Sequence, residues 1–269
     1  MNTPTFDLNN ATVGSIYRLL SEIIPPALAC DWDNVGILVG ERDMRVKNAM
    51  VTLDVDLDVI AQAAALNCDL IVAHHPILLN PLKSFDSAHP DAAIVHALIK
   101  NGIALIVMHT NLDAAANGIN QFIAERIGII DPKPLERAAD GLNGMGRIGA
   151  IKESMRLADY ARAVKDALMT PCVRFIGEPD MQVRNVALVT GSGLDYLELA
   201  KKMGADLLVT GDLKYHAARD AQLIHKFPVI DAGHFPTERF VTEVFAKYLR
   251  IFHIGIHRAK IRDVFNYVF

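Results

Sequence analysis

The chain has 269 residues, of which 51% are hydrophobic and 22% are charged, as expected for a globular protein of one large or two small domains. Its net charge of −4 excludes the basic excess typical of proteins that bind nucleic acid in general. The three cysteines form no CxxC pair, which favours a reducing compartment. Residues 1–7 lack a basic, signal-like start, and no apolar run approaches the ~20 residues of a membrane helix. We therefore expect a cytoplasmic protein without membrane contact.

The first half of the chain alternates predicted helices with short apolar strands. We expect helices over residues 13–24, 57–66, 92–100 and 118–127, and strands over 35–40, 50–53, 70–73 and 104–108. The strands show no alternation of polar and apolar residues, which is typical of a sheet covered by helices on both faces. The pattern predicts an α/β fold.

Turn-forming residues interrupt this alternation after residue 128. Asp131–Pro134 contains two prolines, and residues 141–149 contain four glycines. Such punctuation marks a boundary between folded parts. We therefore predict a first lobe of residues 1–128 plus 227–269, which would carry the metal ligands discussed below, and a second lobe of residues 129–226.

Two stretches of the chain share one order of elements. Val51 to Asp69 and Val189 to Asp206 each run from a strand through a turn and a helix to an apolar strand, over 18 and 17 residues. Each stretch is followed by a helix and a further strand that ends at a histidine, His109 in one and His234 in the other. This similarity predicts two duplicated lobes.

Two adjacent histidines, His74 and His75, follow directly after the predicted strand 70–73. Open α/β sheets bind ligands beyond the carboxyl ends of their strands. Neighbouring side chains of an extended chain point opposite ways, so this pair could reach two different metal ions. A histidine pair that only caps a loop is the alternative.

His109 and Asp113 follow the next predicted strand, 104–108. A carboxylate at this place could bridge two divalent ions, although an Asp at a strand-to-helix turn is more often a helix N-cap. His109 could be a ligand, a proton carrier or a partner that orients a ligand.

His234 and Glu238 form a third candidate pair. If a helix starts at Pro236 and Thr237, the two side chains lie four residues apart and project toward one face. With His74, His75 and Asp113 they supply three imidazoles and two carboxylates, which suits Zn, Fe or Mn. A paired metal site lowers the pKa of a bridging water, so the pattern favours hydrolysis. The sequence contains no GxSxG motif that would indicate a serine hydrolase.

Three further features have a functional and a structural interpretation. The loop Thr190–Gly193 could present backbone N–H groups to phosphate or be an ordinary turn. Lys214–His216 could contact a substrate or lie on the surface. Trp32 and Asn34 could shape the rim of a cleft, or Trp32 could pack in the interior.

The motifs taken together resemble one known family. They run in order along nearly the whole chain: Asp31–Gly36, His74–Pro76, His109–Asp113, Thr210–His216 and Gly233–Glu238. These residues are similar to the Nif-three-like family, whose members are labelled GTP cyclohydrolase 1 type 2 homologs.

The resemblance implies both an architecture and a metal centre. The architecture is two similar lobes, each a sheet flanked by helices, with the metal site in the cleft between them and the chains assembled as a homohexamer. Longer members carry an inserted domain, which this chain lacks. Two divalent ions per chain would be held by the residues that match the family's ligands: His74, His75, Asp113, His234 and Glu238.

The resemblance also implies a reaction. We expect a dinuclear metal-dependent hydrolase acting on a nucleotide or a related small molecule, with GTP ring opening as the reaction that the family label names. His109 or Glu238 would move protons. The sequence contains no motif for reading guanine. The alternative is a metal-binding hexameric scaffold, or a regulatory interaction protein, that turns over no substrate.

Overall fold

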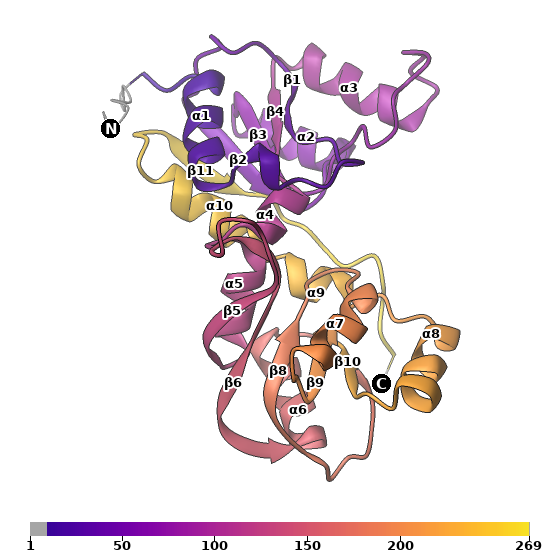
Figure 1. The fold of residues 1–269 in the computed structure, drawn as a ribbon. Coiled ribbons are helices and arrows are strands. Elements are labelled where there is room, and N and C mark those ends of the chain that lie inside the picture. The colour runs from indigo at the N-terminus through magenta and orange to yellow at the C-terminus, as the bar shows by residue number, and fades with distance from the viewer. Residues whose placement is uncertain (1–9, 269) are drawn as a thin grey trace. The chain divides into compact units, whose positions relative to one another are not determined.

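The computed structural model describes residues 10–268, so the expectation about residues 1–7 lies outside the described residues. The chain forms two compact units (Figure 1). Unit 1 contains the chain up to Leu112 together with Val241–Arg262, and unit 2 contains Asp113–Phe240 together with the chain from Asp263. No helix among residues 10–268 is both long and apolar enough to cross a bilayer.

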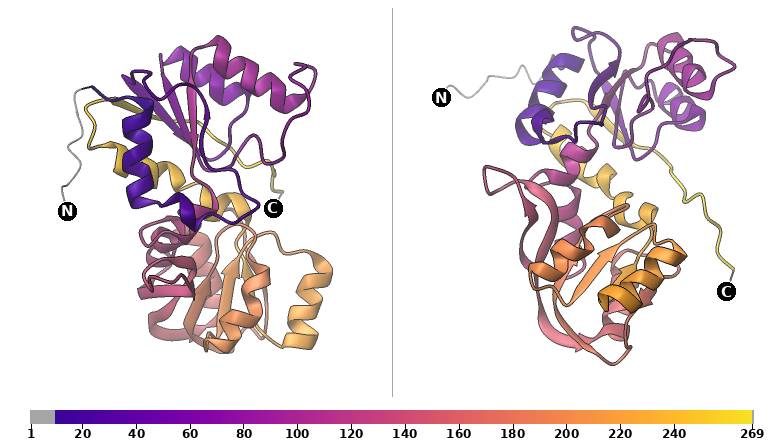
Figure 2. Two further views of the ribbon diagram at one scale, coloured as in Figure 1. Left: turned by 45° about the horizontal axis from the view of Figure 1, so that its top comes forward. Right: turned by 45° about the vertical axis from the view of Figure 1, so that its right-hand side comes forward.

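Unit 1 is built on a sheet with the strand order β1-β4-β3-β2-β11. Strands β2, β3 and β4 run parallel to one another, and β1 pairs with β4 in the antiparallel direction. Helices α2 and α3 lie on one face of this sheet, and α1 and α10 lie on the other (Figures 1 and 2). The elements are α1 (Val13–Ile23), η1 (Pro26–Leu28), β1 (Gly36–Val39), β2 (Asn48–Thr52), α2 (Leu57–Ala65), β3 (Leu70–Ala73), α3 (Pro90–Lys100), β4 (Ala104–Val107), α10 (Val241–Leu249) and β11 (Gly255–Arg258), with α4 (Thr110–Ala114) crossing into unit 2.

The strands of unit 1 are buried as the apolar pattern predicts. Every residue of β3 and β4 is buried, because helices cover both faces. Local signals set the helix starts. The Thr12 and Ser15 side chains form a reciprocal capping box at α1, and the Asp56 carboxylate accepts the backbone N–H of Val59 at the start of α2.

Unit 2 is built on a sheet with the order β5-β6-β8-β9-β10-β7. Strands β8, β9 and β10 are parallel, and β7 pairs with β10 in the antiparallel direction. Helices α5 and α6 pack against the β5–β6–β8 part of the sheet, and α7 packs against β9. The elements are α5 (Ile119–Arg126), β5 (Ile129–Arg137), β6 (Gly144–Arg156), α6 (Leu157–Ala167), β7 (Arg174–Ile176), β8 (Gln182–Leu188), η2 (Leu194–Tyr196), α7 (Leu197–Lys202), β9 (Leu207–Thr210), α8 (Tyr215–Asp220), a π-helical turn η3 (Ala221–His225), β10 (Val229–Asp231) and α9 (His234–Glu238).

The two units share part of their topology, as expected for two similar lobes. In each, three consecutive parallel strands are followed in the sheet by an antiparallel strand that precedes them in sequence; in unit 1, β11 adds a fourth parallel strand beside β2. The Asp69 carboxylate accepts the backbone N–H groups of residues 47 and 48, and the Asp206 carboxylate accepts those of residues 184 and 185. The histidines do not match position for position: His109 follows the end of β4 by two residues, and His234 follows the end of β10 by three.

The observed units differ from the predicted lobes in their bounds. Residues 113–128, residues 227–240 and the chain from Asp263 are predicted in the first lobe, but they lie in unit 2. The reason is long-range pairing: α5 packs on β5 and β6, and β10 extends the second sheet beside β9. Three of the five expected ligands, Asp113, His234 and Glu238, therefore belong to unit 2.

Candidate metal centre

His74 and His75 lie directly after β3 in unit 1. The Nδ1 atom of His74 is 2.9 Å from the carbonyl oxygen of Met108, and that of His75 is 2.7 Å from Oδ1 of Asp54. Their ring centroids are 5.0 Å apart. The chain bends at both residues, so the alternation of an extended strand does not apply there. That the two histidines reach different metal ions stays a prediction.

His109 is held by a buried carboxylate. Its Nδ1 atom is 2.8 Å from Oδ1 of Asp33, whose other oxygen accepts hydrogen bonds from the backbone N–H and the hydroxyl of Thr110. Burial alone would raise the pKa of Asp33, but these hydrogen bonds and the charge of His109 outweigh it and lower that pKa to about 2. Asp33 is therefore a carboxylate at neutral pH and accepts the Nδ1–H of His109.

The three imidazoles of unit 1 converge. Candidate ligand atoms of His74, His75 and His109 lie within 4.8 Å of one another, and we call these residues the three-histidine cluster. The ring of His109 is 5.1 Å from that of His74 and 5.6 Å from that of His75, centroid to centroid. Three neutral imidazoles at this spacing can hold a divalent cation.

His234 and Glu238 lie one turn apart on α9. This helix begins at His234, two residues earlier than expected, and Pro236 sits in the first turn, where a missing N–H costs nothing. Nδ1 of His234 is 2.7 Å from Oδ2 of Asp212, and Nε2 is 2.8 Å from Oε2 of Glu238. The hydrogen bond to Glu238 and the charges of both carboxylates outweigh burial and raise the pKa of His234 to about 9.

Asp113 is the fourth residue of α4 and is 8% exposed. The N-cap interpretation is therefore wrong for this residue, which lies inside the helix. Its carbonyl oxygen accepts a hydrogen bond from the side-chain amide of Asn120, 3.1 Å away. The oxygen of the same amide accepts the backbone N–H of Thr190 at 2.9 Å. Asn120 thus ties α4 to the loop after β8.

The loop Thr190–Gly193 has a structural role. Its backbone N–H groups at Thr190, Gly191 and Gly193 are already donated to side-chain oxygens within unit 2, so the phosphate-cradle interpretation lacks donors. Gly191 has φ +63°, and a Cβ atom there would lie 2.1 Å from Oε1 of Glu238. The absence of a side chain at Gly191 is what leaves room for the Glu238 carboxylate.

The four histidines share one arrangement that fits metal ligation. In each, Nδ1 faces a carbonyl or carboxylate oxygen, so Nδ1 is the N–H donor and Nε2 is the atom that could ligate a metal ion. At His234 this Nε2 atom contacts Glu238. Such outer partners orient metal-ligating histidines and raise their basicity. Asp113 and Glu238 are buried carboxylates, a second kind of side chain that could hold a metal ion.

Sequence reasoning missed the orienting residues. The sequence patterns assign no role to Asp54 or Asn120, and they include Asp33 and Asp212 only as members of motifs. Each contacts a candidate residue that is distant in the chain, apart from Asn120, which is seven residues from Asp113. Only the position of two of these residues in the sequence could have indicated their role, because Asp54 and Asp212 lie in turns just after apolar strands.

The other expected features take different places. Trp32 is 60% exposed, so the packing interpretation is wrong. The side chain of Asn34 donates to the carbonyl oxygen of Leu78. Tyr215 and His216 lie on α8, where Tyr215 is 76% exposed, in agreement with a surface position.

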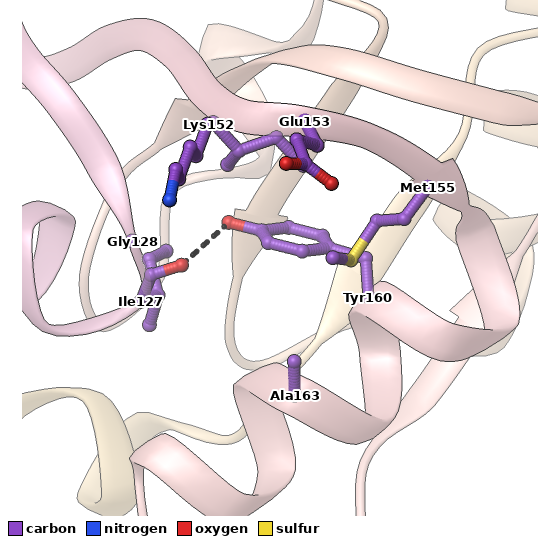
Figure 3. Close-up of a pocket in the computed structure, with 8 residues that line it drawn as sticks. Ile127, Gly128, Lys152, Glu153, Met155, Tyr160 and Ala163 are labelled. Atoms are coloured by element: carbon purple, nitrogen blue, oxygen red, sulfur yellow. Dashed lines mark hydrogen bonds between the residues drawn. The ribbon is translucent and has the colours of Figure 1, made fainter.

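A cavity of about 380 Å³ in unit 2 lies elsewhere (Figure 3). Tyr160 forms its floor and donates its hydroxyl to the carbonyl oxygen of Ile127, and the side chains of Lys152 and Glu153 stand over the ring. None of the candidate ligands lines this cavity. It therefore adds no donor to the metal chemistry.

Comparison with known proteins identifies the family. Residues 11–262 match the family model described as DUF34/NIF3 (NGG1p interacting factor 3). The chain belongs to the DUF34/NIF3 family. A Clostridium acetobutylicum relative in this family, named GTP cyclohydrolase 1 type 2 homolog, is 33% identical over 84% of this chain and 85% of its own length.

Two further proteins are similar to this chain, one of them in a solved structure. A Staphylococcus aureus protein of known structure, SA1388, superposes with a TM-score of 0.89 at 28% identity and covers 96% of this chain and 99% of its own. A Bacillus subtilis GTP cyclohydrolase 1 type 2 homolog is 27% identical over 326 positions that cover 82% of this chain and 87% of its own. That alignment exceeds the 269 residues of the chain, so this relative carries segments that the chain lacks.

Proposed function

We propose that this protein is a dinuclear metal-dependent hydrolase that acts on a nucleotide or a related phosphorylated or heterocyclic compound. The observation that carries the proposal is the shared arrangement of the four histidines: an oxygen acceptor holds Nδ1 in each, which orients Nε2 toward a metal ion or, at His109, toward the substrate. Metal-ligating histidines typically donate the other ring N–H to a carboxylate or a carbonyl oxygen, and three of these four have a carboxylate partner.

Five residues would hold two divalent ions: His74 and His75 from unit 1, and Asp113, His234 and Glu238 from unit 2. The residues from one unit alone supply too few imidazoles or too few carboxylates to hold two ions. This supports a single metal centre with ligands from both units. Continuity of the chain supports it too, because α4 follows His109 directly and contains Asp113. Two cations bound to these residues would supply Lewis acidity and lower the pKa of water.

His109 is suited to move the proton in this reaction. Asp33 holds Nδ1–H, so Nε2 carries the lone pair that can accept a proton from attacking water. The buried carboxylate also stabilises the imidazolium that results, as in other Asp–His pairs. Glu238 is the second candidate for proton transfer, and its 2.8 Å contact with Nε2 of His234 supports this proposal.

The names of the relatives favour a nucleotide as the substrate. Curated relatives from Clostridium and Bacillus are named GTP cyclohydrolase 1 type 2 homolog. For GTP, water would attack C8 of the purine, His109 would accept the proton, and the imidazole ring of the base would open.

A metal-binding homohexameric scaffold without turnover is the second candidate. The exposed apolar side chains near the C-terminus favour an assembly, since Val264 is 85% exposed and Phe265 is 68% exposed. A subunit contact would remove this unfavourable exposure of apolar surface to water. Light scattering should give about six times the chain mass of 29.5 kDa. The mass of a monomer at micromolar concentration would contradict the assembly.

The experiment compares wild type with Glu238→Gln. GTP, other nucleotides and simple phosphoesters are offered with Mn, Zn or Fe, because glutamine keeps the shape but removes a charge and weakens ligation. We expect turnover to fall at least tenfold while the melting temperature changes little. Equal rates in both proteins would identify the activity as a contaminant. No turnover by a wild type that holds both metals would support the scaffold.

A further inference from the structure

We propose that Trp32 is the surface on which the planar ring of the substrate stacks, beside the three-histidine cluster. The substrate class is thereby a compound with a purine or similar heterocyclic base. This inference rests on the proposed function for turnover, but the binding that it describes can be measured without turnover.

Trp32 combines exposure with a position at the cluster. It is the sole tryptophan of the chain and is 60% exposed. Its ring centroid is 6.1 Å from that of His109, and the two ring planes meet at 75°. The two rings are therefore not stacked on one another. A base stacked on the indole would have its edge near His109, the residue suited to accept the proton.

The loop that carries Trp32 is fixed on both sides. Asp33, the next residue, is bonded to His109 and Thr110, and its backbone N–H donates to the carbonyl oxygen of Cys30 at 2.9 Å. The side chain of Asn34 donates to the carbonyl oxygen of Leu78 at 2.6 Å. Trp32 is therefore presented by a rigid turn, and binding a ring there loses little conformational entropy.

The sequence contains no motif that recognises guanine by hydrogen bonds, and stacking on Trp32 would bind a base without one. Bases stack on exposed aromatic side chains through their π-faces, and this contact needs no hydrogen-bonding code. One such contact contributes roughly tenfold or more to affinity. The Asp33–His109 pair and Trp32 share one turn, so the same short segment would place the base and the proton acceptor.

Tryptophan fluorescence tests the proposal directly, because the signal of the chain comes from one residue. The metal-loaded protein is titrated with guanosine, with GTP and with inorganic triphosphate, which has no ring. We expect saturable quenching by guanosine and by GTP and none by triphosphate. The absence of saturable quenching by either purine compound, or an equal response to triphosphate, would overturn the proposal.

Two variants separate stacking from folding. Calorimetric titration should show that Trp32→Ala binds GTP at least tenfold more weakly than wild type, whereas Trp32→Phe keeps most of the affinity and both variants keep the wild-type metal content. Unchanged GTP affinity in Trp32→Ala would overturn the proposal. So would fluorescence that responds to dilution of the protein instead of to nucleotide, because Trp32 would then be a subunit contact.

The two proposals can fail separately. Nucleotide binding that depends on Trp32, without turnover, would support the stacking surface and contradict the proposed hydrolase. Turnover of a nucleotide with the same KM in wild type and Trp32→Ala would support the proposed hydrolase and contradict the stacking surface.

Discussion

The carboxyl group of Asp33 is buried, and its pKa lies well below the ordinary value. The carboxyl group has a pKa of about 2 in the folded chain, against 3.8 ordinarily. A carboxyl group with a lowered pKa stabilises the fold above its ordinary pKa, and the contribution is lost as pH falls toward the folded value. Asp33 therefore stabilises the protein above about pH 4, and this contribution disappears between about pH 4 and pH 2.

Replacement of Asp33 by Asn should remove this contribution. We expect the free energy of unfolding at pH 7 to fall by about 2 kcal/mol, because the charge-assisted bonds to His109 and Thr110 are lost. Between pH 4 and pH 2 the stability of the variant should depend less on pH than that of wild type. Denaturant titrations across this range measure both effects, and parallel pH profiles for the two proteins would refute the role of Asp33.

Gly191 should tolerate no side chain. An added Cβ would lie 2.1 Å from Oε1 of Glu238, so Gly191→Ala should displace that carboxylate and lower metal occupancy as well as stability. The matched control is Gly102→Ala. Gly102 has nearly the same backbone angle, φ +64° against +63°, but nothing lies within 4 Å of its added Cβ. The control should lose only about 1–2 kcal/mol of backbone strain and no metal. Equal metal content in both variants would contradict the close fit at Gly191.

At the scale of elements, Asn120 on α5 connects two segments that carry candidate ligands. Its buried amide bonds the backbone of Asp113 on α4 and that of Thr190, and the adjacent Gly191 donates its N–H to Thr237 on α9. Helices α4 and α9 are each five residues long, too short to be stable alone. Their orientation therefore depends on such cross-links.

Replacement of Asn120 by Ala should loosen α4. We expect a loss of about 1–3 kcal/mol of stability, because two buried backbone groups lose their partner, and a roughly tenfold loss of metal affinity. Asn101→Ala is the control, since its amide bonds a carbonyl on the exposed end of α3 and touches no ligand segment. Competition with a metal chelator measures the affinity. Wild-type affinity in Asn120→Ala would show that Asp113 is positioned without this link.

The elements show where sequence reasoning succeeds. Apolar runs such as 70–73 predict strands well, because burial on both faces leaves a local pattern. The start of α9 and the bend at His74 were missed, because short turns are decided by tertiary hydrogen bonds. The orienting residues Asp54 and Asp212 were missed for the same reason. Each bonds a histidine more than twenty residues away, and no local pattern records that contact.

At the scale of the whole molecule, duplication explains the distribution of the site. Both units place the carboxyl ends of a parallel three-strand run at the start of ligand-bearing segments, and open sheets of this kind bind ligands at those ends. The observed unit bounds differ from the predicted boundary near residue 128, because α5 packs on β5 and β6 and the segment Asp131–Pro134 forms part of strand β5.

The metal content of the purified protein is the most direct test of the proposed centre. Elemental analysis of wild type, if needed after reconstitution with Zn, Mn or Fe, should give close to two divalent ions per chain. Asp113→Ala should lose both ions if the carboxylate bridges them, and loss of only one ion would refute the bridging role alone. A wild-type protein that holds no divalent ion after reconstitution would contradict the account as a whole.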